Sequence, residues 1–155
     1  MNGTRPRLLV LASTFPRWEG DTEPRFVESL SYELADTFDV VVLAPHCRGA
    51  ARKEVFRRDG RQIEVRRFRY CFDALEALAY DGGMLSRVRR NPLRLLLLPL
   101  FLVGQMFAVV RLQREYRIDA IHAHWIVPQG LVMGALSKWS RRTPPVLVTS
   151  HGGDL

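Results

Sequence analysis

Short apolar runs alternate with helical segments along nearly the whole chain. Apolar runs of strand length occupy residues 7–13, 39–44, 119–123 and 145–149. Helical spacing of apolar residues follows Pro24, again over 95–110, and again from about Pro128. Buried parallel strands joined by crossover helices produce this alternation, whereas an antiparallel sandwich does not. The sequence therefore predicts an α/β, Rossmann-like, doubly wound and mostly parallel sheet.

The middle of the chain is less regular. Residues 48–60 are polar and rich in arginine, and residues 62–68 alternate apolar and polar side chains with a period of two. That alternation is typical of a half-exposed strand. We expect 62–68 to form a strand nearer one edge of the sheet.

The size and composition of the chain favour one globular domain over residues 1–155. Hydrophobic residues make up 47% of the 155 residues and charged residues 25%, and the net charge is +7. A basic chain favours phosphates, nucleic acid or an anionic membrane surface as partners. Cys47 and Cys71 fit neither a metal-binding spacing nor a disulfide framework, and residues 8–12 are too short an apolar run for a secretory signal. We therefore expect a reducing, cytoplasmic location.

Two of the predicted strands end in histidine. Residues 119–123 lead into His124 and Trp125, with His122 inside the strand, and residues 145–149 lead into Ser150 and His151. Ligands of open parallel sheets bind outside the carboxyl ends of the strands. These histidines are candidate site residues, although a single histidine at such a place is often only scaffold. Gly152 and Gly153 then let a ligand approach the backbone, or form a simple tight turn.

The loop after the first strand is a second candidate site. Arg17, Gly20 and Arg25 lie between that strand and the helix expected after Pro24. Helix N-termini attract anions through their unpaired amides and their dipole. The loop therefore either forms an anion site or is an ordinary solvated loop.

The sixteen residues from Leu95 to Val110 carry no charge. A spanning helix needs about 20 apolar residues, and this run is shorter and contains Pro99 and Gly104. Two interpretations remain open: a crossover helix packed on the sheet, or an interfacial helix resting on an anionic membrane. Arginines flank the run on both sides, at positions 87, 89, 90, 94, 111, 114 and 117.

With these residues placed, the chain resembles the N-terminal domain of a family 4 glycosyltransferase of the GT-B fold. The resemblance rests on four segments in order: 13–21 with 25–27, then 42–46, 119–125 and 149–154. It implies two Rossmann-like domains facing a cleft, and transfer of a sugar from a nucleotide-diphosphate donor with retention of configuration. It implies no cofactor and no metal. The family's donor-binding C-terminal domain would lie beyond Leu155, so by itself the chain is expected to be inactive.

The resemblance also assigns roles to residues of this chain. His151 matches the histidine near the transferred sugar, where it is the candidate catalytic residue. Gly20 would approach the donor diphosphate, although many relatives have a second glycine where this chain has Asp21. The remaining candidates for substrate binding are Arg17, Arg25, His122, His124, Trp125, Gly152, Gly153 and Asp154.

We expect the acceptor-binding half of a glycosyltransferase that acts on a glycan or lipid-linked acceptor, located in the cytoplasm or peripherally on the inner face of the cell membrane. Two alternatives remain: a nucleotide-sugar epimerase of the same architecture, and a non-catalytic basic α/β module that binds membrane. Aromatic residues do not interleave with a basic stripe as they do in nucleic-acid binders, so no nucleic-acid partner is expected.

Overall fold

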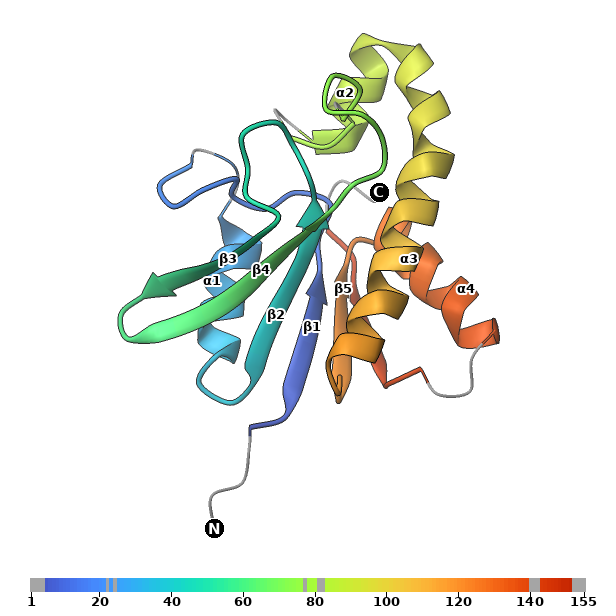
Figure 1. The fold of residues 1–155 in the computed structure, drawn as a ribbon. Helices are drawn as coiled ribbons and strands as arrows, with labels where there is room; N and C mark the ends of the chain where they lie inside the picture. Colours follow the sequence, from blue (N-terminus) through green and yellow to red (C-terminus); the bar gives the residue numbers. More distant parts are fainter. Residues whose placement is uncertain are drawn as a thin grey trace.

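A single six-stranded sheet forms the centre of the protein (Figure 1). The computed structural model describes residues 5–21, 23, 25–76, 78–80, 83–139 and 143–151. The strand order is β3-β4-β2-β1-β5-β6, and all neighbours are parallel except β3 and β4. The strands are β1 (Arg7–Leu11), β2 (Asp39–Pro45), β3 (Lys53–Arg58), β4 (Arg61–Phe68), β5 (Ala120–His124) and β6 (Val146–Thr149).

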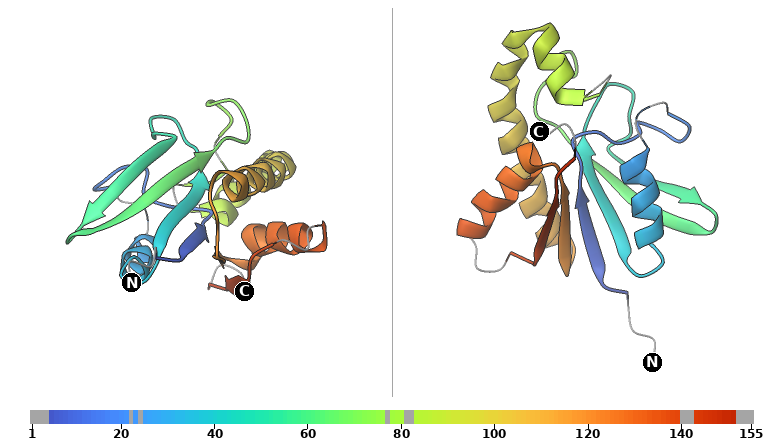
Figure 2. Two further views of the ribbon diagram at one scale, coloured as in Figure 1. Left: turned by 60° about the horizontal axis from the view of Figure 1, so that its bottom comes forward. Right: turned by 180° about the vertical axis from the view of Figure 1, so that it is seen from behind.

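Helices cover both faces of this sheet. Figure 2 shows α1 on one face, with α3 and α4 on the other. The crossover through α1 moves toward β2, while those through α3 and α4 move the opposite way on the opposite face, so all have the same hand. The helices are α1 (Phe26–Leu34), α2 (Gly83–Arg90), η1 (Pro92–Leu97), α3 (Leu98–Glu115), η2 (Ile126–Gly130) and α4 (Leu131–Trp139).

Alternate residues of the central strands face two separate cores. In β1, Leu8 and Val10 pack with α1, whereas Leu9 and Leu11 pack with α3 and α4. All four are buried, which is why the run is apolar without a break. The predicted α/β, doubly wound and mostly parallel sheet is confirmed.

The polar stretch before β4 contains a strand that the sequence analysis does not predict. Residues 53–58 form β3, which pairs antiparallel with β4 through a tight turn. Asp59 and Gly60 in this turn have φ values of 51° and 76°, the left-handed conformation that a two-residue hairpin needs. The alternating strand β4 therefore lies one position inside the sheet edge.

The long apolar segment is a crossover helix with only one face in the core. It runs from Pro92 to Glu115 and, by length and composition alone, could cross a membrane. Phe101, Val109 and Leu112 are buried against the sheet. Yet only 17% of its most apolar 18-residue window is buried. The helix thus serves as a crossover, which is one of the two interpretations left open by the sequence, and it leaves an apolar surface exposed.

Candidate functional site

The carboxyl ends of β5 and β6 hold the candidate histidines together. His122 and His124 project from the same face of β5, because residues two apart in a strand share a face. His122 Nε2 lies 2.8 Å from Thr149 Oγ1, and His124 Nδ1 lies 3.0 Å from His151 Nε2. Both hydrogen bonds link β5 to β6 or to the residues just after it. The two strand ends, where the sequence places the candidate histidines, are therefore joined into one polar cluster.

Aromatic rings surround the imidazole of His151. It stacks on His124 with ring centroids 5.3 Å apart and planes 11° apart. Phe26, the first residue of α1, approaches it at 4.9 Å, and Trp125 approaches it at 5.0 Å. Phe26 and Trp125 also contact each other at 5.6 Å. Apolar rings on these sides hold His151 in place, and planar rings of this kind are suited to pack against the face of a sugar.

Burial keeps His124 uncharged. The side chain is fully buried, and burial, followed by the nearby His122 and His151, lowers its pKa to about 3. Burial and His151 also lower the pKa of His122. Both imidazoles are therefore neutral at pH 7 and can donate only one hydrogen bond each.

The His124–His151 hydrogen bond favours one tautomer. His124 Nε2 is buried and has no hydrogen-bond partner among the described residues. A proton on that atom would leave a buried N–H unpaired, which costs about 1–3 kcal/mol. The favoured arrangement places the His124 proton on Nδ1, donating to His151 Nε2. A neutral His151 then carries its own proton on Nδ1 and acts there as a donor.

The backbone at Trp125 is strained and held at several points. Its φ and ψ are 72° and 141°, a combination that costs a non-glycine residue about 1–3 kcal/mol. Its N–H donates to the Thr149 carbonyl at 2.8 Å. The buried amide of Gln129 bridges β5 to the end of β1, with its nitrogen 3.0 Å from the His124 carbonyl oxygen and its oxygen 2.8 Å from Ser13 N. These hydrogen bonds hold the turn in the conformation that directs the Trp125 ring toward His151.

The loop after β1 is organised by an internal ion pair. Asp21 is buried and accepts hydrogen bonds from the Arg17 backbone N–H, Nε–H and Nη2–H, each at 2.8 Å. Hydrogen bonding to Asp21 raises the pKa of Arg17. Gly20 has a φ of 87°, which the turn between them requires. The carboxylate thus faces Arg17, and the guanidinium charge of Arg17 is compensated within the loop.

The other predicted residues lie beside these two groups or outside the described chain. Arg25 precedes Phe26, donates to the Asp21 carbonyl at 3.3 Å and lies 3.6 Å from Glu28 Oε2. Gly152, Gly153 and Asp154 fall outside the described residues. The roles assigned to all the candidate residues remain predictions.

Several positioning residues were not foreseen from the sequence. Phe26 and Thr149 lie in segments that carry the family resemblance, but the sequence does not predict that either contacts a site residue. Arg67, which is buried, donates to the carbonyls of Pro16 at 2.7 Å and Arg17 at 3.1 Å. No local sequence signal indicates that β4 supports the loop after β1 in this way.

A separate group of potential metal ligands lies after β2. His46, Asp73 and Glu76 place ligand atoms within 4.8 Å of one another. These atoms already bind protein groups: His46 Nδ1 lies 2.5 Å from Glu76 Oε2, Glu76 Oε1 accepts from Tyr70 N at 3.1 Å, and Asp73 pairs with Arg69. These contacts form a polar network, buried at His46 and Glu76 and exposed at Asp73, that holds the segment after β4 in place.

The sheet order and the polar groups at its carboxyl edge define an open, doubly wound α/β domain of the class that binds ligands beyond its strand ends. The sequence profile of Glycosyltransferase Family 4 matches residues 24–155. With most of its length matched, the chain belongs to glycosyltransferase family 4. No curated protein matches it in sequence.

Solved structures agree with this assignment at the level of the fold. Sucrose-phosphate synthase from Thermosynechococcus elongatus has a TM-score of 0.58 and 13% identity, over 96% of this chain and 33% of that one. A second structure of sucrose-phosphate synthase from the same organism has a TM-score of 0.54 and 15% identity, over 97% of this chain and 65% of the other. These neighbours are glycosyltransferases of the GT-B fold, and the chain spans about a third of the length of the first.

Proposed function

We propose that this chain is the acceptor-binding half of a retaining glycosyltransferase. In this proposal a sugar passes from a nucleotide-diphosphate donor to a glycan or lipid-linked acceptor, and a second, donor-binding domain completes the site. The single observation that carries the proposal is the His122–His124–His151 cluster at the ends of β5 and β6 in a family 4 chain. The length of the structural neighbours supports the need for a second domain.

The proposed role of His151 is to hold the transferred sugar by a hydrogen bond. His124 is neutral and donates to His151 Nε2 in the favoured tautomer, so His151 Nδ1–H is the group that would donate to a sugar hydroxyl. Phe26 and Trp125 would close the sides of this position. Neither a metal nor a cofactor has a role in the proposal.

The test compares His151→Ala and His151→Asn in the full-length protein. Nucleoside diphosphate release would be followed with UDP-glucose, UDP-N-acetylglucosamine and GDP-mannose as donors and extracted cell-envelope glycolipids as acceptors. Loss of one transition-state hydrogen bond lowers kcat by about 10²–10³ in comparable sites. We expect His151→Ala to lose activity on that scale while Asn, which keeps a donor, retains more of it.

Stability and an acceptor-free reaction provide the controls. Removal of the imidazole leaves the buried His124 Nδ1–H without its acceptor, which costs about 1–3 kcal/mol, so the activities are compared at a temperature where circular dichroism shows both proteins folded. If the kcat of His151→Ala equals that of the parent, His151 does not belong to the site. Epimerisation of UDP-N-acetylglucosamine by the parent without acceptor would overturn the transferase proposal in favour of an epimerase.

The proposed location is the inner face of the cell membrane, with the protein bound peripherally. The exposed apolar side of α3, flanked by arginines, supports this location because such helices rest in the interface of anionic bilayers. Fractionation of cells that express the tagged protein provides the test: the protein should sediment with membranes and be released by high salt. A protein that stays in the soluble fraction at low salt would contradict the proposed location.

A further inference from the structure

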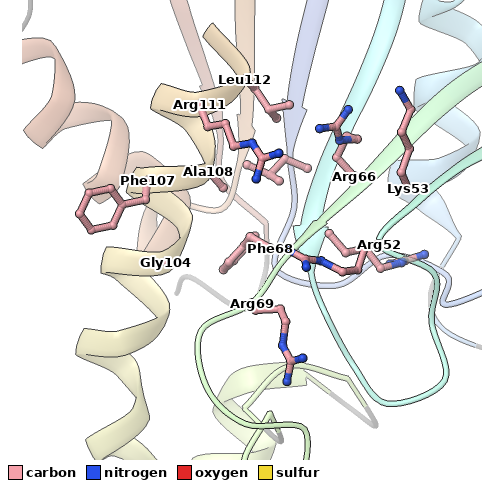
Figure 3. Close-up of a pocket in the computed structure, with 12 residues that line it drawn as sticks. Arg52, Lys53, Arg66, Phe68, Arg69, Gly104, Phe107, Ala108, Arg111 and Leu112 are labelled. Carbon is pink, nitrogen blue, oxygen red and sulfur yellow. The ribbon is translucent and has the colours of Figure 1, made fainter. Parts of the chain in front are cut away.

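A cationic pocket lies on the face of the sheet opposite the histidine cluster. It has a volume of about 500 Å³ and opens between α3 and the strands β3 and β4 (Figure 3). Leu43, Phe68 and Leu112 form its apolar floor, and all three belong to the core on the α3 side. Its basic lining residues are Arg52, Lys53, Arg66, Arg67, Arg69 and Arg111.

Some of these charges are already compensated. Arg66 pairs with Glu115 at 2.7 Å and with Glu64 at 3.2 Å, and Lys53 lies 3.4 Å from Glu64. Arg69 pairs with Asp73 and lies 3.5 Å from Glu76 Oε1. Arg67 pairs with Glu54 at 3.0 Å.

Two cations at the pocket have no close acidic partner among the described residues. Neither Arg52 nor Arg111 forms an ion pair or a side-chain hydrogen bond there. Glu115, whose carboxylate feels the charge of Arg111, is already bound by Arg66. Arg111 extends from α3 toward the strands, as Figure 3 shows. The pocket therefore has a net positive charge and a cation on each side, which is the arrangement that a singly charged phosphate diester would neutralise.

An apolar stripe borders the pocket. Five large side chains recur at intervals of three and four residues along η1 and α3, so they share the outer side of the helix. Phe107 belongs to both features, because it lines the pocket wall and points away from the strands. The exposed fractions are 73% for Leu93, 74% for Leu96, 48% for Leu100, 44% for Val103 and 70% for Phe107.

We infer that the pocket binds the phosphate of an anionic phospholipid headgroup when the apolar stripe lies in the membrane interface. The inference rests on the peripheral membrane contact in the proposed function and assigns it a specific phosphate site. A helix lying flat places Leu96, Val103 and Phe107 below the headgroup level and leaves Arg111 beside the phosphates. Charge complementarity favours a phospholipid as the ligand. Two cations without close acidic partners, next to an apolar stripe, match a lipid with an anionic head and apolar chains.

The experiment measures binding of the full-length protein to vesicles by co-sedimentation. Vesicles of phosphatidylcholine alone are compared with vesicles that contain phosphatidylglycerol. Each basic residue near an anionic surface contributes about 1 kcal/mol, or roughly fivefold in affinity. We expect Arg111→Gln to weaken binding roughly fivefold and Arg52→Gln with Arg111→Gln to weaken it by roughly 25-fold.

Arg58→Gln is the matched control. Arg58 lies on the other face of the sheet, 4.1 Å above the Tyr32 ring, so its loss changes the net charge equally but leaves the pocket intact. Its binding should equal that of the parent. Phe107→Ser tests the stripe separately and should weaken binding without changing the unfolding midpoint, because the ring is 70% exposed.

Three outcomes would overturn the inference. Equal weakening by Arg58→Gln and Arg111→Gln would show attraction by net charge alone. Equal binding to both vesicle types would show no preference for an anionic headgroup, which the inference requires. Protection of Arg111 from phenylglyoxal by inorganic phosphate, without any vesicle binding, would identify a site for a free phosphate ligand instead. Transfer activity on a detergent-solubilised acceptor is measured in parallel, so failure of the lipid site is distinguished from failure of the proposed transferase.

Discussion

Gly104 allows α3 to pack directly on the backbone that follows β4. A Cβ atom at this position would lie 2.8 Å from the Arg69 carbonyl oxygen and 3.2 Å from Tyr70 Cβ. Ordinary contact begins near 3.4 Å, so in Gly104→Ala the helix and this backbone must separate by roughly half an ångström. Overpacking of this kind costs about 1–3 kcal/mol, while alanine returns about 1 kcal/mol of helix propensity.

Gly134→Ala isolates the steric part of this effect. Gly134 lies on the exposed side of α4, and a Cβ there meets nothing within 4 Å. Both substitutions gain the same helix propensity, so the difference between their free energies of unfolding reports the contact with Arg69. We expect Gly134→Ala to be more stable than Gly104→Ala by about 1–3 kcal/mol in urea unfolding followed by circular dichroism. Equal stabilisation by both variants would refute the close approach of α3.

Three further predictions concern polar groups of the core and of the loop after β1. Gln105→Met should raise the free energy of unfolding by about 1–3 kcal/mol, because both amide atoms of Gln105 are buried without a hydrogen-bond partner in the described chain. Gln113→Met is the control: Gln113 lies on a half-buried side of α3, so this substitution should change the free energy of unfolding little. The His124 pKa of about 3 lies below its unfolded value of about 6.5, so the unfolded state binds more protons and stability is lost as pH falls from 6.5 toward 3. His124→Asn should flatten this loss, by up to about 1.4 kcal/mol per pH unit in chemical unfolding measured between pH 6.5 and 5. A double-mutant cycle of Arg17→Gln and Asp21→Asn should give a coupling of about 1–3 kcal/mol, and zero coupling would contradict the loop geometry.

The strands that local patterns predict are the ones whose side chains are buried. The run Leu8–Leu11 is apolar because both faces of β1 are covered, so its type follows from sequence alone. In β3, by contrast, Phe56 is the only buried residue, and apart from the exposed Val55 the rest of the strand is charged. Its one local signal is the Asp59-Gly60 pair, which fits a two-residue hairpin turn.

The histidine cluster could be predicted because topology creates it. Parallel strands end at the same edge, so the sequence places His124 and His151 at one edge of the sheet, whereas their contact is known only from the structure. The conformation of Trp125 could not be predicted in this way, since its positive φ depends on hydrogen bonds to Thr149 and to the turn at Gly130. The support of the β1 loop by Arg67 likewise depends on contacts 50 and 51 residues apart in sequence.

In the proposed function, the histidine cluster and the apolar stripe can serve the same acceptor molecule. The histidine cluster lies on the α1 face at the carboxyl edge of the sheet, and the apolar stripe begins in η1, which stands beyond that same edge in Figure 1. From there the stripe descends along α3 on the opposite face. A lipid-linked acceptor whose chain lies along Leu93 and Leu96 can direct its polar head over the strand ends toward His151. Within the proposed function, this apolar approach is the reason to test lipid-linked acceptors before water-soluble glycans.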